Sequence, residues 1–255
     1  MGESIHYHSF IPFLNDHAFT IVLMMFMAYA IVFAILFLGT RKQKLRPGKA
    51  QNLVEWAVMY VVDYADTVIG KKEAPRFYPL LVMLFFYILV GNLLGLIPGF
   101  ISPTSALSVT AALGVMVFVY EWVSGIAKKG PIKYFAHYFG PPGIPTPIRP
   151  FLFVIELLSD FARPVSLTFR LFGNIMAKET LLGVLIVLVI LLGPAFTTDG
   201  ISAFLASFAF ILRPLIILLG VLVSVIQAGV FTLLTAIYIG GAVAAHDHAE
   251  EHEAH

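Results

Sequence analysis

Residues 158–180, with the sequence LSDFARPVSLTFRLFGNIMAKET, decide how this chain folds. The stretch lies in one of the most apolar parts of the chain, and no Gly/Pro-rich turn lifts its polar side chains into water. It nevertheless contains five charged residues, Asp160, Arg163, Arg170, Lys178 and Glu179. Because an isolated charge is unstable in apolar surroundings, these residues predict either ion pairs within the chain or a functional role.

The composition predicts an integral membrane protein. Of the 255 residues, 59% are hydrophobic and only 12% are charged, whereas a soluble domain carries about 25% charged residues. The net charge of +1 gives no reason to expect a nucleic-acid partner. The chain has no cysteine, which excludes disulfides, thiolate metal sites and cysteine nucleophiles, and we expect no bound cofactor or metal.

Apolar runs long enough to cross about 30 Å of hydrocarbon predict the membrane helices. These runs lie at residues 18–39, 77–97, 105–127, 151–192 and 201–245. The predicted fold class is therefore all-α: a polytopic membrane protein whose whole chain forms one membrane domain with five membrane-inserted helices.

A sixth helix, at residues 49–70, differs from these five because its polar residues gather on one side. At 100° per residue, Asn52, Glu55, Asp63 and Asp66 fall within an arc of about 80°, and apolar residues occupy the rest. This pattern is typical of an amphipathic helix that lies on the membrane surface. A short, weakly hydrophobic membrane span is the alternative.

The basic residues predict the orientation of the chain in the membrane. They cluster at residues 41–49, 71–76 and 128–133, whereas the opposite loops, 91–108 and 193–200, contain neither Lys nor Arg. Because cytoplasmic loops carry the excess of Lys and Arg, we expect the N-terminus outside and the C-terminus in the cytoplasm. A bacterial plasma (inner) membrane fits this arrangement.

The last two predicted helices are too long to cross a membrane upright. Residues 151–192 make a helix of about 63 Å, roughly twice the thickness of the hydrocarbon core. Residues 201–245 have the same excess, and a turn at 193–200 joins the two. We therefore expect a long, tilted, antiparallel pair of helices, with a break at residues 172–174 as the alternative.

The C-terminal residues 246–255 are rich in His and acidic residues. We favour a flexible hydrophilic tail over a metal site there. No G-x-x-x-x-G-K-[ST] run occurs in the chain, so we expect no nucleotide site and no catalysis by this chain alone.

One face of the helix predicted at 151–192 gathers polar side chains. At 100° per residue, the polar residues within about 40° of Arg170 are Glu156, Ser159, Arg163, Ser166 and Asn174. Lys178 lies at the edge of this face, and Glu179 points the other way. On the next helix, the residues within about 60° of Gln227 are Arg213, Gly220, Ser224 and Tyr238.

Arg170 is the charge that internal pairing does not explain. An ionised group at the bilayer centre costs at least about 2.5–3.5 kcal/mol, so it needs a partner, water or a function. Asp160 and Arg163 are three residues apart on one helix and can pair with each other. Arg170 has no acidic residue three or four positions away. We therefore expect it to be functional, with a counter-ion from another subunit.

Two segments now carry a family resemblance. RPVSLTFRLFGNIMAKE (163–179) and SVIQAGVFTLLTAIYI (224–239) resemble the a subunit of F-type ATP synthases, the stationary half of a rotary membrane motor. The resemblance extends over nearly the whole chain, through LVEW, GNLLGLIPG, SALSVTAALG and the paired long helices. The Arg-Leu-Phe-Gly-Asn run within the charged face is its most specific part.

The resemblance implies the function and the partners. It implies that Arg170 faces the carboxylates of a rotating ring of c subunits, and that two half-channels couple proton flow to ATP synthesis elsewhere in the complex. Peripheral-stalk b subunits and the other F0F1 subunits are the further partners implied. In this family, the positions that match Glu179, Asn174 and Gln227 belong to the outer ion pathway, and the one that matches Glu156 belongs to the inner pathway.

The predicted direction of the helix at 151–192, from inside to outside, assigns the half-channels in the same way. Asn174 and Glu179 would lie towards the outer entrance. Glu156 and Ser159 would lie towards the inner exit, with Tyr238 on the neighbouring helix.

Two positions depart from the common family pattern. Lys178 stands where many members have a small residue, and Gly220 stands where many have His or an acid. Because Gly220 leaves space that the Lys178 side chain could fill, the two positions can be coupled. Either Lys178 tunes the outer half-channel, or it is a lysine that extends its charge to the membrane surface.

Two other classes of function stay open from the sequence. A secondary transporter could use the charged face as its substrate site, although such folds often show inverted repeats and none is evident here. A membrane-embedded assembly subunit could use the charges structurally. The choice between H⁺ and Na⁺ also stays open, because the implied ion-binding carboxylate belongs to the ring subunit.

Overall fold

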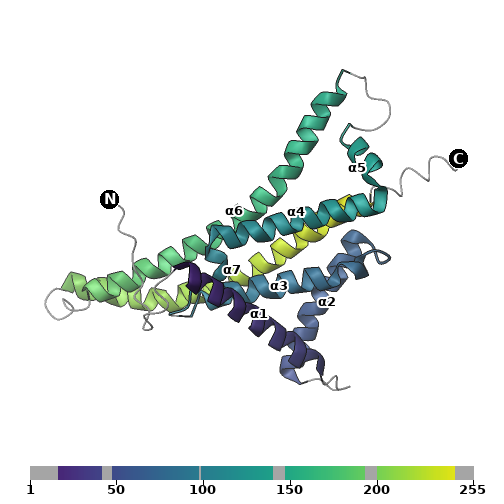
Figure 1. The fold of residues 1–255 in the computed structure, drawn as a ribbon. Coiled ribbons are helices and arrows are strands. Elements are labelled where there is room, and N and C mark those ends of the chain that lie inside the picture. The colour runs from purple at the N-terminus through teal and green to yellow at the C-terminus, as the bar shows by residue number, and fades with distance from the viewer. Residues whose placement is uncertain (1–16, 42–47, 98, 140–146, 193–199, 245–255) are drawn as a thin grey trace. The chain divides into compact units, whose positions relative to one another are not determined.

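The computed structural model describes residues 17–41, 48–97, 99–139, 147–192 and 200–244. Within these ranges all regular secondary structure is helical and no strand occurs (Figure 1). The predicted all-α fold class is confirmed. The predicted tail at 246–255 lies outside the described residues.

The helices follow the apolar runs of the sequence. In chain order they are α1 (His17–Arg41), α2 (Lys49–Ile69), α3 (Tyr78–Leu94), α4 (Leu107–Lys129), α5 (Pro131–His137), α6 (Arg149–Leu192) and α7 (Gly200–Ala244). Two short 3₁₀ turns, η2 (Ala74–Arg76) and η3 (Pro103–Ser105), precede α3 and α4. The sequence did not predict α5.

α3 ends three residues earlier than expected. The amides of Leu96 and Ile97 bond to carbonyls three residues back and tighten the chain into a turn.

Four helices of the described chain are long and apolar enough to cross a membrane, and the chain is an integral membrane protein. Their apolar spans are Phe19–Gly39, Leu107–Lys129, Arg149–Leu191 and Phe210–Val243. α3 has 17 residues, which correspond to about 25 Å of helix, slightly less than the hydrocarbon thickness. α2 is not among the candidate spans, and its place on the membrane surface remains a prediction.

The two last helices are unusually long. α6 has 44 residues and α7 has 45, so each extends about 66 Å, roughly twice the hydrocarbon thickness. α6 continues through residues 172–174, where the sequence left a break open, and it also contains Pro164. The tilt of both helices in the membrane remains a prediction from their length.

The chain forms two compact units, and α3, α6 and α7 each contribute to both. The first unit comprises residues 1–38, 86–106 and 171–228, and the second comprises 39–85, 107–170 and 229–255. In the first unit α6 and α7 run antiparallel (Figure 1). Leu185 of α6 and Ile216 of α7 are buried together. The rings of Tyr29 and Tyr87 stack at 4.4 Å and join α1 to α3.

In the second unit, a close crossing holds α4 against α6. A Cβ atom at Gly114 of α4 would lie 2.5 Å from Oγ1 of Thr168 and 2.9 Å from the carbonyl oxygen of Pro164. Only glycine fits there, as is usual where membrane helices approach closely. The crossing fixes the part of α6 that carries Asp160, Arg163 and the residues leading to Arg170.

Candidate functional site

Arg170 lies on α6 with its side chain exposed, whereas Leu167 and Thr168 in the turn before it are buried. None of the described residues forms a hydrogen bond or an ion pair with Arg170. Arg170 is therefore a permanent positive charge whose hydrogen-bonding capacity is unused within the described chain.

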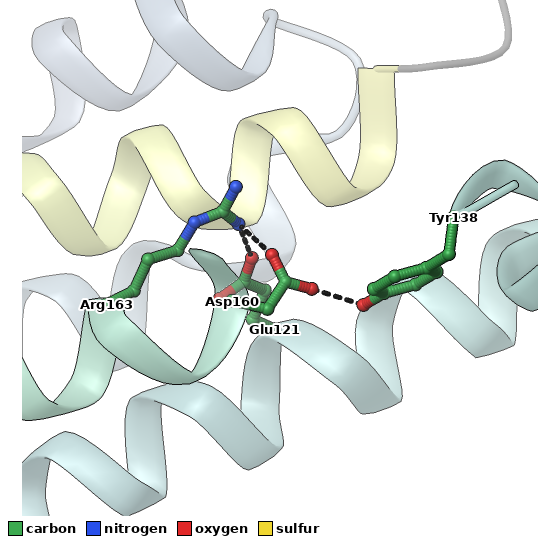
Figure 2. Close-up of polar contacts among 4 residues, drawn as sticks. All are labelled: Glu121, Tyr138, Asp160 and Arg163. Carbon is green, nitrogen blue, oxygen red and sulfur yellow. Dashed lines mark hydrogen bonds and ion pairs between the residues drawn. The ribbon is translucent and has the colours of Figure 1, made fainter. Parts of the chain in front are cut away.

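An ion-pair cluster on the second unit contrasts with this isolated charge. We use this name for Glu121, Tyr138, Asp160 and Arg163 (Figure 2). Nη1 of Arg163 lies 2.6 Å from Oε1 of Glu121 and 3.1 Å from Oδ1 of Asp160. The hydroxyl of Tyr138 donates a hydrogen bond to Asp160. The cluster thus ties α4 and the segment after α5 to α6.

The carboxylates of the ion-pair cluster are buried, with Glu121 only 3% exposed and Asp160 5%. Two buried carboxylates share one guanidinium, and each would be costly without it. The guanidinium also lies over the ring of Tyr238 on α7, 5.3 Å from its centroid. Burial and the hydrogen bond to Asp160 raise the pKa of Tyr138 above its usual range, so this phenol remains a donor.

The sequence anticipated only part of the ion-pair cluster. The predicted pairing of Asp160 with Arg163 is confirmed. Glu121 lies 42 positions from Arg163 and Tyr138 lies 22 positions from Asp160, so helical spacing gave no sign of either contact.

The residues assigned to the inner pathway form fewer contacts with one another than the members of the ion-pair cluster do. Tyr238 is half-buried beneath Arg163, as described above. Glu156 is half-buried and Ser159 is exposed on α6, and neither forms a hydrogen bond with the described residues. The structure therefore brings Tyr238 to Arg163 but does not join Glu156 or Ser159 to a network.

A polar cluster occupies the first unit, where the end of α3 and η3 meet α6. We use this name for Asn92, Ser102, Thr104, Lys178 and Glu179. Nζ of Lys178, a residue only 8% exposed, donates to the carbonyl oxygen of Asn92 at 2.9 Å. Oε1 of Glu179 accepts the backbone N–H of Ser102 at 3.3 Å. These neighbouring charges form no salt bridge with each other, since each bonds to a neutral backbone group.

Hydroxyl groups extend the polar cluster. Oγ of Ser102 donates to the carbonyl oxygen of Gly91 at 2.9 Å and lies 2.7 Å from Oγ1 of Thr104. Thr104 in turn donates to Oδ1 of Asn92 at 2.7 Å. Nδ2 of Asn92 is buried and has no hydrogen-bond partner among the described residues. The sequence gave no sign of the hydroxyl groups of Ser102 and Thr104, because they lie between α3 and α4, where there is no helical periodicity.

The coupling expected between Lys178 and Gly220 has a structural basis. A Cβ atom at Gly220 would lie 3.2 Å from Cδ of Lys178 and 2.6 Å from Cδ2 of Leu96. The aliphatic part of Lys178 therefore lies beside Gly220, and the coupling of the two positions remains a prediction.

Asn174 and Gln227 connect α6 to α7 within the first unit. Nδ2 of Asn174 donates to Oε1 of Gln227 at 2.8 Å. Gln227 is only 4% exposed, and its Nε2 has no partner among the described residues. The side chain of Gln227 is thus held in place through its oxygen, while its N–H group stays free among the described residues.

No metal site emerges from the part of the chain that the structure describes. Within it, no three His, Asp or Glu residues lie close enough together to hold a metal ion. The His-rich segment considered from the sequence lies beyond the described residues.

Comparison with known proteins identifies the family. The family model described as ATP synthase A chain matches residues 22–240. The chain belongs to the ATP synthase subunit a family. Relatives named ATP synthase subunit a include those of Desulfotalea psychrophila, 39% identical over 222 residues (85% of this chain and 83% of the relative), and Granulibacter bethesdensis, 38% identical over 222 residues (87% and 86%). A third, from Helicobacter pylori, is 33% identical over 231 residues (91% and 92%).

Membership in the ATP synthase subunit a family confirms the resemblance inferred from the sequence. The matched residues include α6 and α7 up to residue 240, so the unpaired arginine, the ion-pair cluster and the polar cluster all lie within the family region.

Proposed function

We propose that this chain is the ion-translocating stator subunit of a rotary F-type ATP synthase. It would provide two half-channels and present Arg170 to the carboxylates of a rotating c ring, and thereby couple proton flow to ATP synthesis. The observation that carries the proposal is the state of Arg170, an exposed cation on a long apolar helix without a partner among the described residues.

The cost of a membrane charge argues that the partner of Arg170 comes from outside the chain. A cation at the bilayer centre costs at least about 2.5–3.5 kcal/mol. Arg163 on the same helix offsets such a cost with two carboxylates. Because Arg170 has no such acid among the described residues, a carboxylate on a neighbouring ring would supply the compensation.

The chemistry of a guanidinium suits this task. It stays protonated at every relevant pH, and a nearby cation favours the charged form of a carboxylic acid. An arriving ring carboxyl would release its proton towards one side, pass Arg170 as an anion, and take up a proton from the other side. The fixed positive charge would also keep protons from crossing directly between the half-channels. Each charge that moves through 100 mV releases about 2.3 kcal/mol.

The outer half-channel would use Asn174, Lys178, Glu179 and Gln227. Glu179 bonds to a neutral amide instead of a cation, so proton uptake would not break an ion pair. The free N–H group of Gln227 provides a fixed donor in a buried position. The carboxyl of Glu179 could thus take up or release a proton, and the amide of Gln227 could order water, without a large electrostatic penalty.

The inner half-channel would use Glu156, Ser159 and Tyr238, and it would open on the side that carries the basic segments. That side would be the cytoplasm of a bacterium, with the chain in the inner membrane, the N-terminus outside and the C-terminus inside. The partners would be the c ring, the peripheral-stalk b subunits and the remaining F0F1 subunits.

ATP synthesis by membranes that carry Arg170→Ala tests the proposal. We expect a normally assembled complex that makes no ATP when an ion gradient is imposed. Arg76→Ala, which removes an arginine with a 78% exposed side chain outside the apolar helices, is the matched control and should retain synthesis. A poorly assembled complex would favour a structural role, and an assembled, active complex would reject the motor proposal. Gradient-driven uptake of a small solute by the chain would favour a transporter instead.

A further inference from the structure

The short helix α5 begins one residue after a membrane-spanning helix ends. The apolar span of α4 ends at Lys129, Gly130 turns the chain with a φ of +76°, and α5 starts at Pro131. A positive φ favours glycine, which suits this turn. α5 must therefore begin at the membrane boundary.

Packing against α4 holds α5 beside the end of that helix. The ring of Tyr134 lies against Gly125 of α4 so closely that no Cβ atom would fit there. Tyr134 also contacts the ring of Trp122 edge-on, with centroids 6.2 Å apart. Because Gly125 precedes Lys129 by about one helical turn, α5 lies beside the last turns of α4 instead of extending into water.

α5 and the residues that follow it have two different faces. Tyr134 and Tyr138, four residues apart, are buried against the protein. Ile132, Phe135 and Phe139 occupy another face, with exposures of 85%, 39% and 43%. These three side chains and Pro131 line an open hollow of about 430 Å³. Ile132 is thus largely uncovered, whereas Phe135 and Phe139, which also contact the rings of Trp122 and Phe153, are partly uncovered.

Three lysines, Lys128, Lys129 and Lys133, lie at the end of α4 and on α5. Nζ of Lys128 pairs with Glu73 at 2.9 Å. Nζ of Lys129 lies 5.8 Å from the centroid of the Tyr134 ring. Lys133 is exposed, and no acidic side chain of the described residues pairs with it. Two of the three ammonium groups therefore have no acidic partner within the described part of the chain.

We propose that α5 is an interfacial anchor that binds anionic phospholipid. Ile132, Phe135 and Phe139 enter the boundary between headgroups and acyl chains, and Lys129 and Lys133 bind lipid phosphates. The continuity of α5 with a membrane span argues for lipid as the occupant, since a segment at this depth meets headgroups first. Aromatic and aliphatic side chains beside lysines are the combination that interfacial helices present to anionic membranes.

The anchor acts on a part of the chain that also holds α6. Tyr138, on the buried face of this segment, donates to Asp160 of the ion-pair cluster. Lipid bound on the other face therefore holds the same segment in place. The inference rests on the chain being an integral membrane protein and is independent of the role proposed for Arg170.

Spin labels at single cysteines test the anchor, and the chain has no cysteine of its own. We would place a nitroxide at Ile132→Cys or at Phe139→Cys in an assembled complex without other reactive cysteines. Vesicles of phosphatidylcholine would be compared with equimolar phosphatidylcholine and phosphatidylglycerol. Collisions with oxygen report contact with lipid, and collisions with a water-soluble nickel chelate report contact with water. Lys71→Cys, in the exposed turn after α2, provides the aqueous reference.

In the mixed vesicles we expect both α5 labels to meet oxygen more often than nickel, and the Lys71→Cys label to show the reverse. Lys133→Gln should raise by about fivefold the phosphatidylglycerol fraction at which the excess of oxygen over nickel collisions reaches half of its maximum. Lys71→Gln should leave this fraction unchanged. Labels that meet nickel would reject membrane insertion. Labels shielded from both reagents would reveal a protein partner and overturn the proposal. Equal results in both vesicle types would overturn the preference for anionic lipid.

Discussion

α6 carries two groups of charges, and they are held in opposite ways. In the ion-pair cluster, the guanidinium of Arg163 contacts two buried carboxylates directly, at 2.6 and 3.1 Å. In the polar cluster, Lys178 and Glu179 are neighbours of opposite sign that bond to neutral groups of Asn92 and Ser102. In the first group the charged side chains pair with one another, and in the second they bond to backbone groups.

This difference bears on which carboxylates can change their protonation state without losing a contact that holds helices together. Protonating either carboxylate of the ion-pair cluster would weaken its contact with the guanidinium of Arg163, and these contacts tie α4 to α6. A carboxylate bonded to an amide can gain or lose a proton while its neighbours keep their hydrogen bonds. We therefore expect the ion-pair cluster to hold helices together and the polar cluster to exchange ions.

Arg163→Met should have the largest effect on stability, because it leaves two buried carboxylates without a cation. Breaking a buried ion pair from one side costs about 3–5 kcal/mol. We expect the lower end of this range, since the side chain of Arg163 is 31% exposed. The measurement is the amount of chain in purified complexes and its half-life on heating.

Neutralising the whole ion-pair cluster is the control for this variant. Arg163→Met combined with Glu121→Gln and Asp160→Asn removes all three charges while keeping similar volumes, and replacing a complete buried pair is often close to neutral. We expect most of the lost stability to return. If the triple variant assembles but proton-driven synthesis stops, the cluster takes part in ion movement and the comparison between the two groups fails.

The structure of the ion-pair cluster was only half predictable from the sequence. A spacing of three residues on one helix indicates that Asp160 and Arg163 can meet, because local geometry fixes their separation. Glu121 joins them through the crossing of α4 and α6 at Gly114, which depends on tertiary packing. α5 was missed because its seven residues are too few to form an apolar run.

In contrast to Arg163→Met, Glu179→Gln should leave the complex normally assembled but with little ATP synthesis. The amide keeps an oxygen that can accept the N–H of Ser102 but cannot carry a proton through the path. We expect synthesis to fall about 100-fold, the lower end of what positioned proton-transfer groups contribute. Glu179→Asp, which keeps the carboxylate, should retain more activity than Glu179→Gln. Equal activity of the wild type and Glu179→Gln in ATP-synthesis assays would remove Glu179 from the pathway.

Lys178→Gly tests whether the lysine tunes the polar cluster or only fills space beside Gly220. Removing a cation next to Glu179 changes the electrostatic environment of that carboxylate. We expect the pH dependence of ATP synthesis to shift, with a severalfold change in rate at the extremes of pH. Lys178→Met, which loses the charge but keeps most of the side chain, should shift it equally. An unchanged pH profile in both variants would leave Lys178 a packing residue.

The ion pair of Glu73 and Lys128 is more exposed than the ion-pair cluster, and it should contribute least to stability. The hydrogen bond from Lys128 lowers the pKa of Glu73 below its ordinary value of 4.5. A lowered folded-state pKa gives stability above the unfolded-state value, and this stability is lost as the pH falls through the folded-state pKa. Because Lys128 has a side chain that is 34% exposed, we expect Glu73→Gln to cost only about 0.5 kcal/mol. Heating half-lives of variant and wild type should differ at neutral pH and converge in acid.

The polar cluster shows why the rest of the candidate site could not be predicted. The helical face of α6 gave Asn174, and its contact with Gln227 follows once α6 and α7 pack antiparallel. Ser102 and Thr104 lie in the loop between α3 and α4, where no periodicity indicates which side chains face α6. Their roles depend on how that loop folds back onto the helix.

The partner of Arg170 in the assembled complex is the most direct test of the whole account. Electron cryo-microscopy of the intact complex can identify the carboxylate nearest to the guanidinium. The account predicts a carboxylate of the neighbouring c ring, reached directly or through one water. A salt bridge between Arg170 and an acid of its own chain, or a guanidinium turned to lipid away from any ring, would contradict it.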